Sequence, residues 1–226
     1  MNDLYLSKSK AYYTSVRTDL VSMVIGNPLQ KILEIGAGGG ETLCYIKENK
    51  IAQEVVGVDL FAIEGTSQKN VLIDCFLIKD IEKEDIDYPE GYFDVILCGD
   101  VVEHLSDPWT VIKKLSFYLK NDGRLIISTP NFRNWRNFVT IFLKGRFLYN
   151  PAGGLLDKTH LRFFCKKDII ELVSTDSLSC TSIMPINYFI DYQFSLPVRW
   201  FNIITFKVFE EFLAYQYIVV GTKVQP

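Results

Sequence analysis

The sequence is poor in histidine and cysteine and has no long uncharged apolar stretch. Its closest cysteines, Cys165 and Cys180, are 15 positions apart, so it has no C-x-x-C pair for zinc or redox chemistry. Scattered thiols in odd number are typical of a reducing compartment, and we expect a cytoplasmic protein. No run approaches the ~18 apolar residues of a membrane-spanning helix, and the N-terminus lacks the apolar core of a secretory signal.

Positive charge is not in excess either. Lysine and arginine number 24 against 27 acidic residues, which gives a net charge of -3. We therefore expect no DNA binding, and RNA is disfavoured, although four basic residues cluster between Arg133 and Arg146. Charged residues also interrupt the apolar stretches 138–149 and 201–217. These stretches could belong to the core, line a cleft, form a dimer face or touch a membrane surface. The choice between monomer and homodimer stays open as well.

The chain does contain alternating strand and helix signals in an ordinary globular composition. Helices are expected at 9–25, after Gly40, from Pro108 with Asp107 as its N-cap, and at 166–174. The alternation predicts an α/β fold, a Rossmann-like, doubly wound and mostly parallel seven-stranded sheet. The predicted strands are 31–35, 54–60, 70–75, 92–98, 124–129, 180–185 and 215–224.

Two segments interrupt this alternation. Residues 130–164 and 187–213 are rich in aromatic side chains, and we expect them to be helical lid insertions on a single domain, 1–226. Aromatic faces suit sugar rings, quinones or lipid-linked acceptors, and nearby basic residues suit a phosphate or carboxylate. The same aromatic residues could instead form only the cores of the lids.

A glycine-rich passage between the first strand and its helix is the first chemical signal. Gly36 and Gly38 allow a tight turn and a close approach to a ligand, and the helix N-terminus suits an anionic group. The next strand ends in Asp59, which could accept hydrogen bonds from ribose hydroxyls. Glu41 replaces the third glycine of the dinucleotide fingerprint, and no Walker lysine follows, so an adenosyl ligand with a short zwitterionic tail remains. Alone, the glycines could serve only a strand–helix turn.

Six segments occur in order along the chain: YYTSVRTDLV, KILEIGAGGG, VVGVDL, KDIEKEDIDYPEGYFDVILCGDVVEHLSDP, LIISTPN and DKTHLRFF. Together they resemble the class I S-adenosylmethionine-dependent methyltransferases from about Tyr12 to Phe164. VVEHLSDPW and THLRFF are similar to the bacterial ubiquinone-type and glycan-modifying O-methyltransferases. Ala37 departs from the family, which often has cysteine there.

The resemblance implies S-adenosylmethionine as cofactor and assigns contacts residue by residue. Asp59 would hold the ribose hydroxyls, and Asp80 the adenine amino group. The other implied contacts are Glu34, Gly36, Ala37 and Gly38 to the methionine part, Leu60 and Ile81 to the adenine faces, and Cys98 and Gly99 to the sulfonium end. Individually, Asp59 and Asp80 could be surface caps, and Cys98 a small core residue.

The two histidines both lie in family-like segments. The sulfonium carries an activated methyl group, so the protein must align the acceptor and take the proton of an acceptor hydroxyl. His104 is the candidate base, and a cap or loop-holding role is its alternative. His160, Arg162 and Tyr13 are candidates for binding the acceptor, although His160 and Arg162 could instead pin the excursion, and Tyr13 could belong to a solvated helix.

Asp100, Glu103 and His104 form a D-x-x-E-H cluster. The ubiquinone-type enzymes that it resembles carry E-x-x-E-H there, which can bind a divalent metal. We expect no metal requirement here and keep these three residues as the candidate ligands.

The expected function is direct in-line O-methylation of a sugar or lipid-linked glycan hydroxyl, as in polysaccharide biosynthesis. A quinone-like phenol or other small molecule is the alternative acceptor. An NAD-dependent oxidoreductase, an RNA methyltransferase and a non-catalytic cofactor-binding module remain as rivals.

Overall fold

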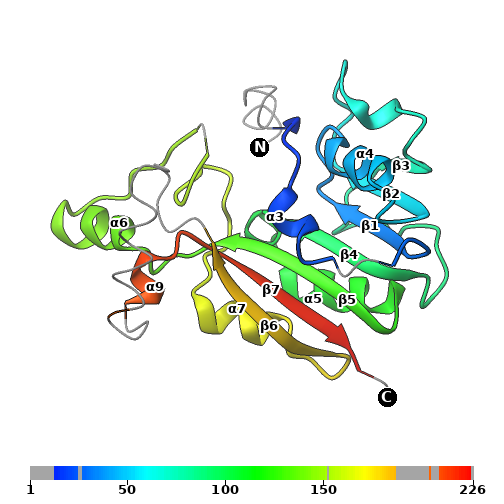
Figure 1. The fold of residues 1–226 in the computed structure, drawn as a ribbon. Coiled ribbons are helices and arrows are strands. Elements are labelled where there is room, and N and C mark those ends of the chain that lie inside the picture. Colours follow the sequence, from blue (N-terminus) through cyan, green and yellow to red (C-terminus); the bar gives the residue numbers. More distant parts are fainter. Residues whose placement is uncertain (1–12, 25–26, 152, 187–203, 205–208, 225–226) are drawn as a thin grey trace.

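The computed structural model describes residues 13–24, 27–151, 153–186, 204 and 209–224. A seven-stranded sheet with the order β3-β2-β1-β4-β5-β7-β6 runs through it (Figure 1). The strands β1 to β5 pair in parallel, while β7 is antiparallel to both β5 and β6. Their bounds are β1 Lys31–Ile35, β2 Glu54–Asp59, β3 Cys75–Ile78, β4 Phe93–Gly99, β5 Leu119–Pro130, β6 Leu178–Ile186 and β7 Gln216–Lys223. The predicted doubly wound, mostly parallel sheet is confirmed.

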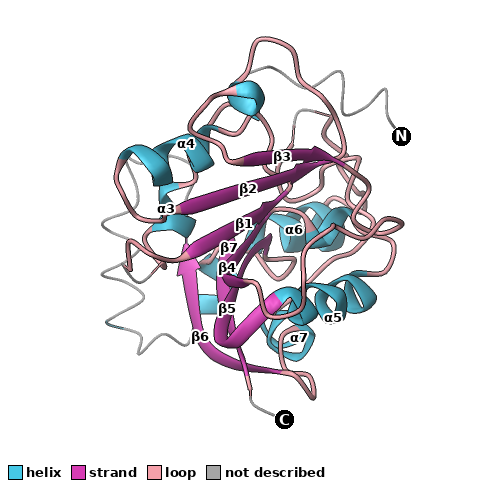
Figure 2. Cartoon of the chain, turned by 90° about the vertical axis from the view of Figure 1, so that its right-hand side faces the viewer, coloured by secondary structure: helices cyan, strands magenta, loops and turns pink. Residues whose placement is uncertain are grey.

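Helices cover both faces of this sheet (Figure 2). Alternate side chains of β1 enter two different cores, Leu33 packing with α5 and α7, and Ile32 with α3 and α4. Burial on both faces explains why these strands are near-continuous apolar runs. The helices of the described residues are α3 Thr18–Val21, α4 Glu41–Glu48, α5 Pro108–Tyr118, α6 Trp135–Phe138, α7 Lys166–Leu172 and α9 Glu210–Leu213. The same part of the chain contains the shorter turns η1 Ser67–Lys69, η2 Val102–His104 and the π-helical η3 Val139–Leu143.

The start of α5 agrees with its sequence signal. Asp107 caps the helix by accepting a hydrogen bond from the backbone N–H of Thr110 at 3.1 Å, and Pro108 occupies the first helical position. After α5 the chain enters β5 directly, and Asp122 has a left-handed backbone, with φ of 62°.

The predicted third strand, 70–75, is wrong. The Asn70 side chain accepts a hydrogen bond from the backbone N–H of Leu72 at 3.0 Å, which holds this segment in a turn. Val71 is almost completely exposed. Pairing with β2 starts only at Cys75, so the strand lies a few residues further along the chain.

The predicted helix 9–25 is also wrong over its middle, because Thr14–Arg17 are not helical and α3 begins at Thr18. The backbone here bonds to other parts of the chain. The N–H of Gly39 donates to the carbonyl of Tyr13 at 2.8 Å, and the N–H of Arg17 donates to Oγ1 of Thr42 at 3.2 Å. Residues 9–12 and 25 lie outside the described residues.

The excursion after β5 extends away from the sheet and carries α6 and η3 (Figure 1). Asn131 anchors its base by donating from Nδ2 to the carbonyls of Glu211 and Ala214, at 2.7 and 2.8 Å. Most of the predicted insertion 187–213 lies outside the described residues. Among the residues that are described, no helix has the length and apolarity needed to cross a membrane.

Candidate active site at the carboxyl edge of the sheet

The glycine loop follows β1 and is tied to the end of β2. The N–H groups of Gly36 and Ala37 both donate to the carbonyl of Val58, at 2.9 and 3.1 Å. A Cβ on Gly36 would lie 2.4 Å from Cγ2 of Val101, and one on Gly38 would lie 2.9 Å from the carbonyl oxygen of Tyr13. Both residues also have positive φ, so these two glycines are required for shape.

The predicted partner of the loop, Asp59, lies beside it. One carboxylate oxygen accepts from the N–H of Gly38 at 2.7 Å, and the other accepts from the N–H of Phe61 at 3.1 Å. Burial raises the pKa of Asp59. Since Gly39 and Gly40 also donate within the protein, all five loop amides from Gly36 to Gly40 have partners. The loop is therefore preformed by hydrogen bonds within the protein.

Gln68, on η1, is a loop residue that sequence reasoning missed. Its Nε2 donates to the carbonyls of Gly38 and Phe61, at 2.7 and 3.0 Å, and its Oε1 accepts from the N–H of Ile63 at 2.8 Å. One amide side chain thus connects the glycine loop to the segment after β2. A single glutamine in a loop carries no sequence signal that would have revealed this.

Buried carboxylates lie beneath the loop. Glu34, on β1, is only 5% exposed, and burial raises its pKa to about 8, with further contributions from the charges of Asp59 and Glu41. Within the described part of the chain, Oε2 of Glu34 and Oε2 of Glu41 are buried without a hydrogen-bond partner. Such oxygens fit a ligand that brings a cationic group, such as the ammonium of an amino-acid tail.

Arg17 reaches this edge from the N-terminal segment. Its guanidinium donates to Asp100 at 2.8 Å, to Ser128 at 2.9 Å and to both carboxylate oxygens of Asp19. A Cβ on Gly99 would lie 2.6 Å from Cδ1 of Leu20 and 2.8 Å from Nη1 of Arg17, so both side chains pack closely over the end of β4. The neighbouring Cys98 is fully buried in the core cluster, which supports its reading as a packing residue.

Of the residues predicted to contact adenine, Asp80 and Ile81 lie just beyond β3, and Leu60 directly follows β2. The N–H of Lys79 donates to the carbonyl of Asp59 at 2.9 Å and brings this turn beside β2. Asp80 forms an ion pair with Lys83 at 2.6 Å, and Ile81 is buried in the core. Leu60 is 45% exposed. Contact of these side chains with a ligand stays a prediction.

The two histidines lie together although 56 positions separate them. The His104 and His160 ring centroids are 4.8 Å apart. Nδ1 of His104 is 3.1 Å from the carbonyl of Thr159, and Nδ1 of His160 is 3.3 Å from that of Leu155. A carbonyl only accepts, so each Nδ1 carries the proton, and Nε2 holds the lone pair of the neutral ring. The lone pair is what a base or a metal ligand needs.

Glu103 is the acidic neighbour of this histidine pair. It is 2% exposed, and Oε1 lies 4.0 Å from Nε2 of His160, while Oε2 accepts from the hydroxyl of Thr129 at 3.1 Å. Burial, followed by the charge of Asp100, raises the pKa of Glu103 well above its usual value. A neutral, protonated Glu103 is the form that this surrounding favours.

The predicted ligand set Asp100, Glu103 and His104 is not the group that the structure brings together. Asp100 bonds Arg17, Ser128 and Gln216 instead. In the part of the chain that the structure describes, the grouped ligand atoms are those of Glu103, His104 and His160, all within 4.8 Å of one another. Two imidazoles and a carboxylate are a donor set that suits a divalent transition metal.

Arg162 makes hydrogen bonds that hold two chain segments together. Its guanidinium donates to the carbonyls of Ser106 and Leu161, and its N–H donates to the carbonyl of Glu103 at 3.0 Å. The THLRFF segment is thereby held against η2. A crevice too narrow to admit a water molecule passes beside it, lined by Glu103, Pro130, Phe132, Leu155, His160, Arg162 and Phe163.

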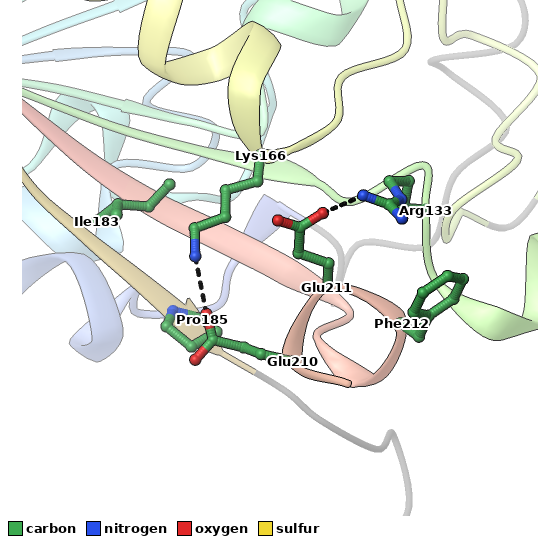
Figure 3. A pocket seen from close by; sticks show the side chains of 7 residues that line it. All are labelled: Arg133, Lys166, Ile183, Pro185, Glu210, Glu211 and Phe212. Carbon is green, nitrogen blue, oxygen red and sulfur yellow. Dashed lines mark hydrogen bonds and ion pairs between the residues drawn. The ribbon is translucent and has the colours of Figure 1, made fainter. Parts of the chain in front are cut away.

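A larger cavity of about 470 Å³ lies elsewhere, between α9 and the ends of α7 and β6 (Figure 3). Lys166 pairs with Glu210 at 3.0 Å in it, and Arg133 pairs with Glu211. Arg133, from the basic cluster noted in the sequence, lines it, but none of the residues predicted to bind the cofactor does. The cavity is thus separate from the glycine loop.

Comparisons with known proteins agree with this geometry. The family model described as "Methyltransferase domain" matches residues 10–178. A ubiquinone biosynthesis O-methyltransferase of Shewanella halifaxensis is 28% identical over 184 residues, 76% of this chain and 74% of that protein. A SAM-dependent methyltransferase structure from Archaeoglobus fulgidus superposes with a TM-score of 0.63 at 18% identity, covering 95% of each chain. The [4+2]-cyclase SpnF has a TM-score of 0.64 at 16% identity, over 92% of this chain and 80% of its own. Likeness at these identities shows the fold alone.

The buried Glu34 predicts a pH dependence of stability. Its pKa is about 8 in the folded chain against the ordinary 4.5, so the unfolded chain releases the proton first as pH rises. The free energy of unfolding therefore falls as the pH rises from 4.5 to about 8. The stability that protonated Glu34 contributes is fully present only below this range. Because glutamine does not titrate, Glu34→Gln should melt above the wild type at pH 8 and near it at pH 5, by calorimetry without ligand.

Glu48→Gln, at an exposed position on α4, is the matched control and should not change the melting temperature at either pH. Equal shifts of the Glu34 variant at both pH values would show that Glu34 does not hold a proton in the folded chain.

Proposed function

This chain belongs to the methyltransferase-domain family and is a class I S-adenosylmethionine-dependent methyltransferase, and from that premise we propose that it methylates a hydroxyl oxygen of a small-molecule or glycan acceptor. The observation that carries the proposal is the preformed glycine loop with unpartnered carboxylate oxygens beneath it. We further propose that 1–226 is one methyltransferase domain, and that it works in the cytoplasm, where its five free cysteines would stay reduced.

On the cofactor side of the site, the amino-acid tail and the ribose of the ligand are proposed to bind different acidic residues. Glu34 and Glu41 would meet the ammonium of the amino-acid tail, which would also draw Glu34 into its ionised form. Asp59 would accept from the ribose hydroxyls. S-adenosylmethionine supplies an activated methyl group when bound. The remaining task of the protein is to orient the acceptor and exclude water.

His104 is proposed as the base that takes the proton of the acceptor hydroxyl. Its Nδ1 contact with the carbonyl of Thr159 sets the tautomer, so Nε2 is the basic nitrogen. A base assigned in this way must come within hydrogen-bond reach of the acceptor oxygen. His160, beside it in the acceptor crevice, would help to orient the acceptor.

The acceptor itself is proposed to be a sugar or lipid-linked glycan hydroxyl. Phe132 and Phe163, with ring centroids 4.9 Å apart, line the crevice and offer flat apolar faces to a ring. A quinone-like phenol is the second candidate, because the curated relatives carry the name ubiquinone biosynthesis O-methyltransferase. Either acceptor has a flat ring face that would stack on these side chains once the crevice opens, so the two residues do not separate the two proposed acceptors.

Transfer of a labelled methyl group should separate the acceptors. With labelled S-adenosylmethionine, we expect label in a lipid-linked saccharide fraction as an alkali-stable ether, and none in RNA. Label in a catechol-type quinone precursor alone would replace the glycan proposal by the phenol. Transfer to nitrogen or to RNA, or no transfer to any fraction despite cofactor binding, would contradict O-methylation.

Asp59→Ala should weaken binding of S-adenosylhomocysteine at least tenfold. Two hydrogen bonds to a charged group, each of ~1.5–3 kcal/mol, would be lost. Isothermal titration is the measurement, and Asp85→Ala is the control, because the Asp85 side chain is 80% exposed and should leave affinity unchanged. Unchanged affinity in the Asp59 variant would remove it from the site, and tight binding of NAD would favour the oxidoreductase.

His104→Ala should lower kcat about a hundredfold or more while changing cofactor affinity little, since a positioned base contributes ~10²–10⁴. The acidic limb of the kcat–pH profile should disappear with the base. His160→Gln is the comparison and should keep that limb. A His104 variant that loses cofactor affinity but keeps kcat would be a binding variant, which contradicts the assignment.

A further inference from the structure

The excursion after β5 carries an exposed apolar surface that the site does not use. Residues 142–150 are all exposed, and this stretch reads FLKGRFLYN. Phe142 and Leu143 are 72% and 71% exposed, and Phe138 on the preceding turn is 49% exposed. We name residues 135–149 the basic-aromatic arm. Large side chains gathered in this way on one projection are costly to leave in water.

Charge on the arm has a single sign. Residues 131–156 contain four basic residues and no acidic one, whereas the whole chain has a net charge of -3. Lys144 and Arg146 are exposed at the same tip as Phe142 and Leu143, while Arg133, at the base, is already paired with Glu211. The local charge is therefore opposite to that of the molecule, and it favours an anionic partner.

The arm is continuous with the acceptor side of the site. Ring stacking runs from Tyr149 to Phe147 and on to Phe132, with centroid distances of 5.9 and 6.5 Å. Phe132 lines the crevice that also contains Glu103 and His160. The apolar surface thus leads from the exposed tip toward the predicted site.

We infer that the basic-aromatic arm docks this enzyme on the surface of an anionic lipid bilayer. The apolar rings enter the headgroup region, and Lys144 and Arg146 face the lipid phosphates. Each basic side chain near such a surface adds to binding, and salt weakens that contribution. Binding of this kind needs no spanning helix. It would present the crevice to acceptors held in the membrane, whichever hydroxyl is methylated.

Vesicle flotation with the full chain tests this inference. We expect the protein to float with phosphatidylcholine vesicles that contain about 30 mol% phosphatidylglycerol at about 0.1 M salt, and to be released at about 1 M salt. It should not float with phosphatidylcholine alone. Equal binding to both vesicles, or to neither, would overturn the inference.

Two variants separate the apolar and the electrostatic parts. Phe142→Ser with Leu143→Ser, and Lys144→Gln with Arg146→Gln, should each lower the bound-to-free ratio on anionic vesicles at least tenfold. All four positions are exposed, so the fold should survive, and unchanged S-adenosylhomocysteine affinity checks this. Binding retained by both variants would overturn the inference.

Matched controls lie far from the arm. Leu29→Ser with Val71→Ser removes two side chains that are 68% and 98% exposed and that precede β1 and β3 in the chain. Figure 1 shows these two strands on the side of the molecule opposite α6. Lys113→Gln with Lys167→Gln removes two exposed charges from α5 and α7. Both should bind vesicles as the wild type does. A lipid-free dimer that the Phe142–Leu143 variant abolishes would make the arm an interface between copies, which also overturns the inference.

Failure of this experiment and failure of the proposed function are distinguishable. Vesicle binding is measured without cofactor or acceptor, and methyl transfer to a water-soluble acceptor can be measured without vesicles. Loss of one result therefore leaves the other standing.

Discussion

The hydrogen bond from the N–H of Gly38 to the carboxylate of Asp59, at 2.7 Å, joins the two chain segments on which the rest of the site depends. It connects the loop after β1 to the end of β2, and it holds Gly38 so that its carbonyl meets Gln68. The neighbouring Gly39 then presents its N–H to Tyr13. Buried polar groups without partners are costly, so these bonds specify one shape for the loop.

Around this loop the protein gathers acidic groups that cannot all be ionised without a cation. Burial raises the pKa of Glu34 and of Asp59, and the charges of Asp59 and Glu41 raise that of Glu34 further. The guanidinium of Arg17, which reaches this edge, is shared by Asp19 and Asp100. A cationic ligand is thus the natural complement of this edge, and the sulfonium nucleoside of the methyltransferase family is a ligand of that kind.

The proposed acceptor side is held together differently. Its two imidazole rings are oriented by the backbone carbonyls of Thr159 and Leu155. Arg162 and the N–H of Leu161 fasten the same segment to η2. Because the proposed cofactor residues belong to the sheet edge and most of the proposed acceptor residues to the excursion after β5, this arrangement would let acceptor choice vary without changing the sheet.

Local patterns were sufficient for much of this molecule. Apolar runs located most strands, Asp107 and Pro108 marked the start of α5, and the spacing from the glycines to Asp59 placed the loop beside β2. These features arise from side-chain periodicity and turn chemistry within a few residues. The chain alone therefore specified the sheet, the glycine loop and its acidic partner.

Long-range hydrogen bonds decided the remainder. Thr14–Arg17 are not helical because their surroundings, the glycine loop and Thr42, offer better partners than a local turn. Asp100 is not part of the candidate ligand group because Arg17, 83 positions away, pairs with it. His160, from the excursion after β5, lies beside Glu103 instead. Contacts between residues so far apart depend on how the sheet closes its edge, and periodicity along the chain carries no information about them.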